Sequence, residues 1–127
     1  MQSLKVMVVD DSLLSQKKLI SIIEDLGHQV VTIAGTGAKA LDAYGDHLPD
    51  IVTMDITMPD MDGIEATRWI LSRYPDARIV MVTSHAQKAM VLEALDAGAK
   101  GYIIKPFQSD KLREAFERVV PQSKIQA

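Results

Sequence analysis

The sequence predicts an α/β protein in which helices cover both faces of one five-stranded parallel sheet. Short apolar runs alternate with helical patterns five times along the chain. These runs lack the alternation of apolar and polar residues that marks a sheet with one face in water, so we expect both faces to be buried. Right-handed crossovers would then produce an α/β/α sandwich. At 127 residues, the chain fits a single domain with a substantial core.

The first half of the chain contains three predicted strands and two predicted helices. The strands are runs rich in β-branched and other apolar residues: 5–9, 29–33 and 51–54. Ser12 is a suitable N-cap for a helix through about Leu26, and Gly27 is its stop signal. Glycines at positions 35 and 37 break the chain before a second helix, which carries apolar residues at helical spacing: Ala40, Leu41 and Tyr44.

The third helix is predicted from a capping pattern. Turn-forming residues fill positions 58–63, and Asp62 followed by Glu65 is a pair that can cap a helix. The inner face of this helix is expected to include three residues: Ile64, Trp69 and Ile70. Trp69 would then be at least partly buried against the sheet.

Two more strands and two more helices are predicted in the last part of the chain. The strands are 78–82 and the short run 102–104, and between them a helix over 87–96 ends before Gly98. Ser109 is expected to cap the last helix. That helix carries an apolar stripe at helical spacing: Leu112, Ala115, Phe116, Val119 and Val120.

Composition excludes several classes of protein. Fourteen Lys and Arg residues against 17 Asp and Glu residues give a net charge of −3, unlike the basic footprint of a nucleic-acid-binding protein. No apolar run approaches the roughly 20 residues that span a bilayer, so we expect no membrane insertion. The chain has no cysteine, which excludes disulfides and thiolate metal sites. The amino terminus has no signal-peptide pattern, and we expect a cytoplasmic protein.

The sequence also predicts which methionine and histidine side chains lie in the core and which are exposed to solvent. Met7, Met54 and Met81 lie in predicted strands, and we expect them in the core. Met90 on the fourth helix is the best candidate for an exposed methionine. Two histidines near helix ends are expected to be solvated: His28 and His47.

Charged residues directly follow the predicted strands. Asp10 and Asp11 come after the first strand, Asp55 after the third and Lys105 after the fifth. The carboxyl ends of parallel strands meet at one edge of the sheet, where open α/β folds bind ligands. Clustered carboxylates repel one another unless a cation joins them, and hard oxygen ligands suit Mg²⁺. The sequence therefore predicts a divalent-metal and phosphoryl site with one aspartate as nucleophile.

Other acidic residues near this site have a simpler explanation. Asp50, Asp60 and Asp62 lie among turn-forming residues. Short polar side chains in turns commonly accept hydrogen bonds from nearby backbone groups. We therefore expect these three to cap helices or face solvent.

Four short motifs fall in register on this pattern: Val8 to Ser12, Asp55 to Pro59, Val82 to Ser84, and Lys105 to Phe107. In order and spacing they resemble the receiver domain of two-component response regulators, over roughly residues 4–120. The resemblance implies a doubly wound, flavodoxin-like (βα)5 fold with strand order 2-1-3-4-5. We therefore assign residues 1–121 to a receiver domain and 122–127 to a short polar tail.

The resemblance implies roles for individual residues. Asp55 would accept the phosphoryl group. Asp10, Asp11 and Asp55, with the backbone carbonyl of Thr57, would hold Mg²⁺ or Mn²⁺. Lys105 would contact the phosphoryl oxygens. Phosphoryl transfer depends mainly on positioning and charge neutralisation, which these groups can supply.

The remaining residues implied by the resemblance concern switching and phosphate lifetime. Thr83 would hydrogen-bond the phosphoryl group, and Tyr102 would change rotamer with it. Pro106 lies where receivers usually have a cis peptide bond. Thr57 and His85 lie at positions where receivers tune the lifetime of the phosphoaspartate.

The leading hypothesis is therefore a signalling switch, not an enzyme, that takes a phosphoryl group from a histidine kinase. An aspartyl-phosphate phosphatase of the haloacid dehalogenase type is disfavoured, because its second catalytic Asp would stand where Thr57 is. A flavodoxin-like electron carrier is disfavoured, because Asp10 and Asp11 would repel the flavin phosphate. The complete set of acids, threonine and lysine disfavours a receiver-like module that no longer takes phosphate.

Phosphorylation is expected to reshape the face formed by the fourth helix, the fifth strand and the last helix. Candidate partner contacts on or beside this face are Lys88, Met90, Lys100 and Lys111. The runs 50–59 and 87–91 are similar to the chemotaxis branch of the family, which implies the flagellar motor switch as partner. A phosphorelay intermediate and the isolated receiver of a longer transcriptional regulator are the alternatives. We expect a monomer or a weak dimer.

Overall fold

The computed structural model describes residues 3–120, in which strands and helices alternate. The strands are β1 (Lys5–Val9), β2 (Gln29–Ala34), β3 (Ile51–Met54), β4 (Ile79–Thr83) and β5 (Gly101–Ile104). The helices are α1 (Leu13–Asp25), α2 (Gly37–His47), α3 (Gly63–Arg73), α4 (Lys88–Asp96) and α5 (Ser109–Val119). The predicted alternation is confirmed, and the predicted tail at 122–127 lies outside the described residues. No helix within 3–120 has the length and apolar character needed to cross a membrane.

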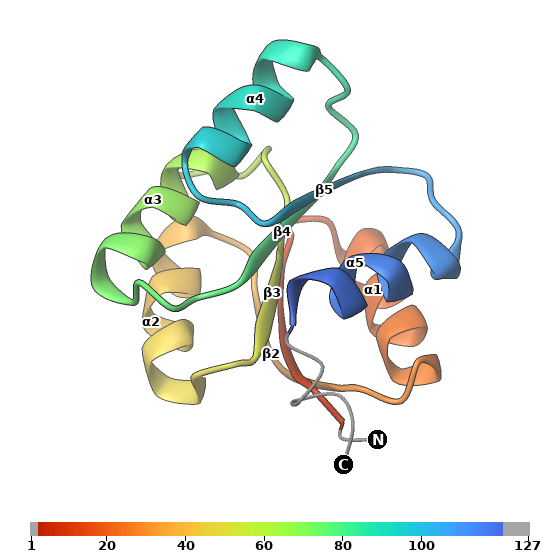
Figure 1. Ribbon diagram of the computed structural model, residues 1–127. Helices are drawn as coiled ribbons and strands as arrows, with labels where there is room; N and C mark the ends of the chain where they lie inside the picture. The colour runs from red at the N-terminus through yellow and green to blue at the C-terminus, as the bar shows by residue number, and fades with distance from the viewer. Residues whose placement is uncertain (1–2, 121–127) are drawn as a thin grey trace.

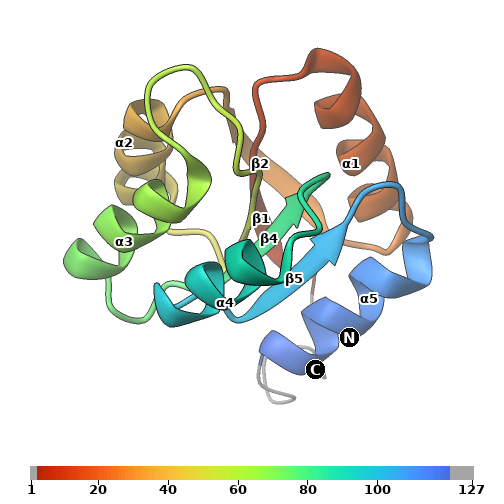
Figure 2. The same cartoon turned by 90° about the horizontal axis from the view of Figure 1, so that it is seen from above.

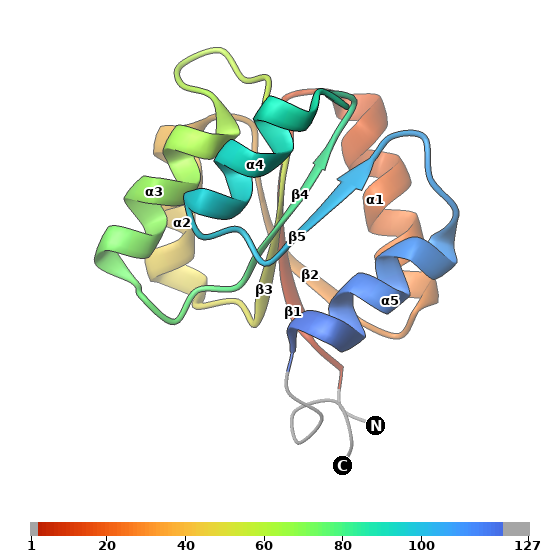
Figure 3. The same ribbon diagram turned by 45° about the horizontal axis from the view of Figure 1, so that its top comes forward.

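All five strands form one parallel sheet in the order β2-β1-β3-β4-β5, as the resemblance implied. Helices α1 and α5 cover one face of the sheet, and α2, α3 and α4 cover the other (Figures 1 and 2). In Figure 3 the arrowheads of β4 and β5 point toward the upper edge of the molecule, where the loops after the strands gather. The carboxyl ends of the strands therefore meet along one edge.

Strand side chains alternate between two separate cores. The core under α2, α3 and α4 contains the strand residues Met7, Val9, Val52, Met54 and Met81. The core under α1 and α5 contains the strand residues Val6, Val8, Ile51, Val80 and Val82. Each of these side chains is at most 1% exposed. The prediction that both faces are buried is confirmed, and so is the placement of the three strand methionines in the core.

Local signals explain where several helices begin and end. Ser12 and Asp62 cap α1 and α3 as predicted, each accepting a hydrogen bond from the backbone N–H three residues later. Thr36 caps α2 in the same way. Gly27 and Gly98, after α1 and α4, have φ angles of +91° and +111°, which glycine adopts without steric cost. Both predicted stop signals are therefore confirmed.

Two predictions about helices are wrong. Trp69 is 54% exposed, because the buried face of α3 is formed by other positions: Gly63, Ile64, Ala66, Thr67 and Ile70. Ser109 is the first residue of α5 and not its cap. Gln108 occupies the cap position, and its side chain makes no capping hydrogen bond. Packing of its apolar stripe into the core therefore stabilises α5 more than a capping hydrogen bond does.

Smaller differences concern strand limits and Met90. Strand β2 extends to Ala34, β5 begins at Gly101, and Thr83 is the last residue of β4 and not the first residue after it. Met90 was predicted to be exposed, but it is half-buried and packs against the core under α4. Helix α4 lies over this core and so draws the side chain inward.

His28 is not a simple solvated residue. Its Nδ1 atom accepts a hydrogen bond from the backbone N–H of Leu4 at 3.1 Å. Its ring lies against Phe116 of α5, with the centroids 5.6 Å apart. Partial burial lowers the pKa of His28 below its ordinary value. The neutral ring of His28 therefore links the start of β1 to α5. His47 is exposed, as predicted.

Because the pKa of folded His28 is depressed, acid should destabilise the protein. As the pH falls below about 6.5, the unfolded chain takes up a proton that the folded protein resists, so the free energy of unfolding should fall. His28→Leu should remove this part of the pH dependence. At neutral pH the substitution should cost about 1 kcal/mol, since the Leu4 amide loses its acceptor.

Urea unfolding at a series of pH values between about 8 and 5 measures this effect. His47→Leu is the matched control, because His47 is exposed and should leave the slope unchanged. Equal pH slopes for the wild type and His28→Leu would contradict the assignment.

Candidate functional site

The predicted site residues lie at the carboxyl ends of neighbouring strands. Thr83 is the last residue of β4, while Asp10, Asp55 and Lys105 directly follow β1, β3 and β5. The backbone N–H groups of these three donate to carbonyls of neighbouring strands or strand ends at 3.0, 2.9 and 2.8 Å, respectively. These bonds continue the sheet by one residue, so the backbone that carries each functional side chain is held in place.

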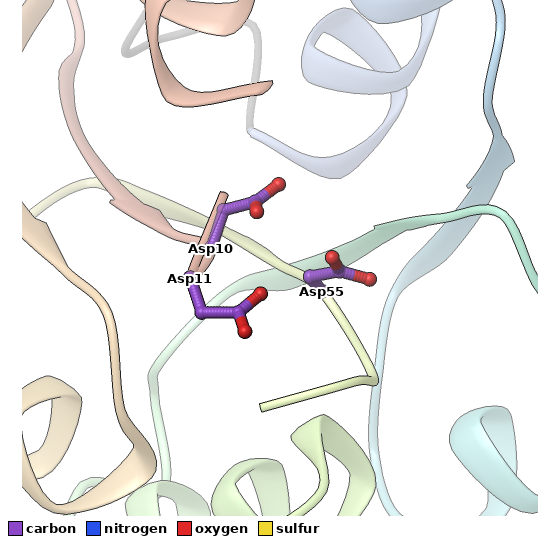
Figure 4. A group of neighbouring side chains, drawn as sticks. All are labelled: Asp10, Asp11 and Asp55. Carbon is purple, nitrogen blue, oxygen red and sulfur yellow. The ribbon is translucent and has the colours of Figure 1, made fainter. Parts of the chain in front are cut away.

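Three carboxylates form a cluster at this edge (Figure 4). One oxygen from each of Asp10, Asp11 and Asp55 lies within 4.8 Å of the others. Asp10 is fully buried, the side chain of Asp55 is 12% exposed, and Asp11 is exposed. Carboxylates this close repel one another unless positive charge is present. The predicted cluster is therefore assembled, and its oxygen donors suit a hard divalent cation.

The Asp10 carboxylate is surrounded by donors. Its Oδ1 accepts from the backbone N–H of Ser12 at 2.9 Å, and its Oδ2 accepts from the Ser15 hydroxyl at 2.6 Å. The side-chain amide of Gln16 donates to the backbone carbonyl of Asp10 at 2.6 Å. The first turn of α1 thus satisfies a buried charge that would otherwise be costly. The contacts of Ser15 and Gln16 were not predicted from the sequence, although both residues lie about one helical turn after the acidic pair.

Lys105 joins two of the carboxylates. Its ammonium nitrogen lies 2.7 Å from Oδ2 of Asp10 and 3.4 Å from Oδ2 of Asp55. With 23% of its side chain exposed, Lys105 is much less screened by solvent than a surface lysine. One ammonium balances only one of the three carboxylates, so the site keeps an excess of negative charge that a cation could neutralise. The peptide bond from Lys105 to Pro106 is cis, as the resemblance implied.

The backbone at Asp55 is tightly packed by Gly63. Oδ1 of Asp55 accepts from the N–H of Ile56 at 2.7 Å, and the N–H of Gly63 donates to the Ile56 carbonyl at 2.8 Å. A methyl group on Gly63 would overlap the carbonyl oxygen of Asp55. Glycine is therefore required here for close approach, and it lets α3 begin directly against the predicted phosphoacceptor.

His85 connects three residues that the resemblance assigned separately. Its Nε2 atom lies 2.7 Å from the hydroxyl of Thr57, across the two loops that follow β3 and β4. Its N–H donates to the hydroxyl of the buried Thr83 at 3.4 Å, and its carbonyl accepts from the hydroxyl of Tyr102 at 2.8 Å. Burial, and then the negative charge of Asp55, raise the pKa of Tyr102. The predicted switch and lifetime residues thus form one hydrogen-bonded group.

One hollow opens at the site, and another lies beside β5 and α5. A cleft of about 470 Å³ opens beside Asp55, between α1 and the segment after β5. Its lining includes Leu14, Lys18, Ile22, Lys105 and Phe107. Lys100 and Lys111 line a second hollow, beside β5 and α5. Lys88, Lys100 and Lys111 are exposed, as a partner surface requires.

Asp60 and Asp62, which were predicted to cap helices or face solvent, both accept hydrogen bonds from the first turns of helices. Asp62 caps α3, its own helix. Asp60 instead accepts from the N–H groups of Gly37 and Ala38, in the first turn of α2. The prediction of capping is confirmed for both, but that Asp60 caps a different helix could not be read from neighbouring residues.

Comparisons with known proteins agree with this geometry. The family model for the response regulator receiver domain matches residues 6–117. The chemotaxis protein CheY of Listeria monocytogenes is 42% identical over 115 residues, which cover 91% of this chain and 97% of that protein. The chemotaxis protein CheY of Thermotoga maritima is 44% identical over 115 residues, with 91% and 96% covered.

A solved structure has the same fold. A chain of the CheX–CheY–BeF3–Mg²⁺ complex from Borrelia burgdorferi aligns with a TM-score of 0.84 and 35% identity. The alignment covers 87% of this chain and 84% of that chain. The similarity therefore extends over most of both chains and is not confined to the short motifs.

Proposed function

This chain belongs to the response regulator receiver family, and we propose that it acts as a phosphoacceptor switch of a two-component system. A histidine kinase would supply the phosphoryl group, and Asp55 would receive it. The observation that supports this most strongly is the ammonium of Lys105, which contacts both Asp10 and Asp55. These contacts hold a positive charge next to the carboxylate that would carry the phosphoryl group.

The proposed transfer is a direct displacement at phosphorus. A carboxylate oxygen of Asp55 forms the new P–O bond while the P–N bond of the donor phosphohistidine breaks, and the imidazole leaves and takes up a proton. The protein supplies position and charge, which is most of what phosphoryl transfer needs. The cleft beside Asp55 gives a donor access to the carboxylate. The chain would promote only its own phosphorylation and dephosphorylation.

The donor set fits a divalent cation. Asp10, Asp11 and Asp55, whose oxygens gather within 4.8 Å, would hold Mg²⁺ or Mn²⁺ together with the backbone carbonyl of Thr57. When bound, the cation would neutralise charge on the phosphoryl oxygens. Lys105 adds one positive charge from the end of β5. The excess negative charge of the site is the feature that supports this assignment.

We place the output of the switch on the face formed by α4, β5 and α5. Thr83 and Tyr102 both bond to His85, so displacement of one hydroxyl affects the group that holds the other. Lys88, Lys100 and Lys111 are exposed on or beside this face, and Met90 of α4 is half-buried. Because the relatives above are chemotaxis proteins, we propose the flagellar motor switch as the downstream partner.

Phosphoramidate with Mg²⁺ should add the mass of one phosphoryl group to the wild type, and Asp55→Asn should abolish this gain because the nucleophilic carboxylate is gone. Omitting the metal should also abolish it. Intact-protein mass spectrometry is the measurement. Asp62→Asn, a change in the same loop that keeps an oxygen to cap α3, should label like the wild type. Labelling of Asp55→Asn on serine or histidine would refute the proposal.

The hydrogen bond between Thr57 and His85 should control phosphate lifetime. We expect Thr57→Ala and His85→Ala each to accelerate hydrolysis of the phosphoaspartate several-fold, because either change removes the bridge between the two loops and admits water. The double variant should lose phosphate no faster than the single variants, since all three lack the same bond. Phosphate release from purified phosphoprotein measures the rates. Effects that multiply in the double variant would contradict a shared role.

Beryllofluoride, which stands in for the phosphoryl group, should move amide signals from the site to residues 87–105 in the wild type. In Thr83→Ala the changes should stay near the site, because no hydroxyl remains to bond the added group. Thr83→Ser, which restores the hydroxyl, should recover the long-range changes. The lost coupling should be about 1–3 kcal/mol. A Thr83→Ala protein whose signals move like those of the wild type would exclude this route.

A further inference from the structure

Asp60 joins the loop after β3 to a helix that is distant in sequence. Its Oδ1 accepts from the N–H of Gly37 and its Oδ2 from the N–H of Ala38, both at 2.9 Å. These residues, 23 and 22 positions away, are the first two of α2. Oδ1 also accepts from the N–H of Met61 at 2.9 Å. One carboxylate therefore fixes both its own loop and the start of α2.

The neighbouring Met61 adds a packing contact to the same junction. A methyl group on Gly37 would overlap the side chain of Met61, so the two residues are in close contact. Met61 also packs against the core under α2, α3 and α4. We call the group Gly37, Ala38, Asp60 and Met61 the clasp.

The clasp holds one end of the segment that carries Thr57. The other end is held by the hydrogen bond from Gly63 to the carbonyl of Ile56. Thr57, whose carbonyl is assigned to the metal, lies between these two fixed points. Gly35, two residues before the clasp, lies beside the backbone of Asp10 and Asp11. The clasp itself therefore holds the loop after β3, which carries Thr57, against the start of α2.

Capping of α2 alone does not explain this arrangement. Thr36 already accepts from the N–H of Lys39, as a local cap does. The first N–H groups of a helix lack acceptors within the helix, and they form a site for negative charge. Asp60 remains exposed, so its charge costs little desolvation, and the N–H groups of Gly37 and Ala38 lower its pKa. The carboxylate thus stays ionised and bound to α2.

We propose that Asp60 is a positioning residue of the metal site, which acts through the clasp by holding the loop that presents the Thr57 carbonyl. This inference rests on the proposed function, since it assumes that the site binds Mg²⁺. Groups that orient metal ligands commonly change metal affinity by about 10-fold or more when they are removed. A clasp at the loop should act in the same way without touching the metal.

Mg²⁺ titrations followed by amide chemical shifts would test the inference. Asp60→Ala should weaken Mg²⁺ binding by roughly 10-fold and speed amide exchange at residues 56–61. Asp60→Asn keeps one oxygen acceptor, so its affinity should fall between those of Asp60→Ala and the wild type. Gly37→Ala displaces Met61 from the α2 side and should also weaken binding. Thr36→Ala is the matched control, because it removes a cap of α2 without touching the loop.

The comparison with Thr36→Ala decides between positioning and helix stability. Thr36→Ala should lower the stability of the protein to unfolding by urea but leave Mg²⁺ affinity unchanged. Wild-type affinity in Asp60→Ala, or equal losses of affinity in Asp60→Ala and Thr36→Ala, would overturn the inference. A wild type that binds no Mg²⁺ would overturn the proposed function instead, and amide exchange at residues 56–61 would still show whether Asp60 holds the loop.

Discussion

The burial of Asp10 is the constraint on which the site depends. Its carboxylate is removed from water at the end of β1, where an unpaired charge would cost several kcal/mol. The first turn of α1 and the ammonium of Lys105 offset that cost. Because Lys105 follows β5, this ion pair links two strands that β3 and β4 separate in the sheet. The contact that neutralises Asp10 therefore also keeps a cation within 3.4 Å of Asp55.

The two sides of this site are held with different firmness. On the α2 side, Asp60 bonds two backbone amides of the helix, and Gly63 packs against the Asp55 carbonyl. On the α4 side, the helix has no side-chain cap, and among the described residues Ala94 is its one buried side chain. Few buried contacts and an uncapped end indicate a low cost of local rearrangement. The α2 side is thus the more firmly held of the two, and local rearrangement costs less on the α4 side.

Sequence patterns located those parts of the site that depend on local order. An apolar run followed by a charge placed Asp55 and Lys105 at strand ends, because strand polarity in a parallel sheet brings such ends together. The contacts of Asp60 could not be predicted, since its partners lie 22 and 23 residues away. The exposure of Trp69 was missed because the rotation of α3 depends on how the helix packs over the sheet. The strand order came from the resemblance, not from periodicity.

The bonding of Thr83 indicates where the energy for switching would arise. Its hydroxyl is buried and accepts a hydrogen bond from His85 at 3.4 Å, which is long for an N–H···O bond. Among the described residues, no hydrogen bond donated by this hydroxyl is found. A phosphoryl oxygen on Asp55 would give the O–H group an acceptor, and movement of the hydroxyl toward that oxygen would break the weak bond from His85. The His85 backbone that this exchange releases also holds the Tyr102 hydroxyl. A small local gain at Thr83 could therefore free the tyrosine and shift the beginning of α4, provided that the gain exceeds the loss of one well-formed bond at 2.8 Å.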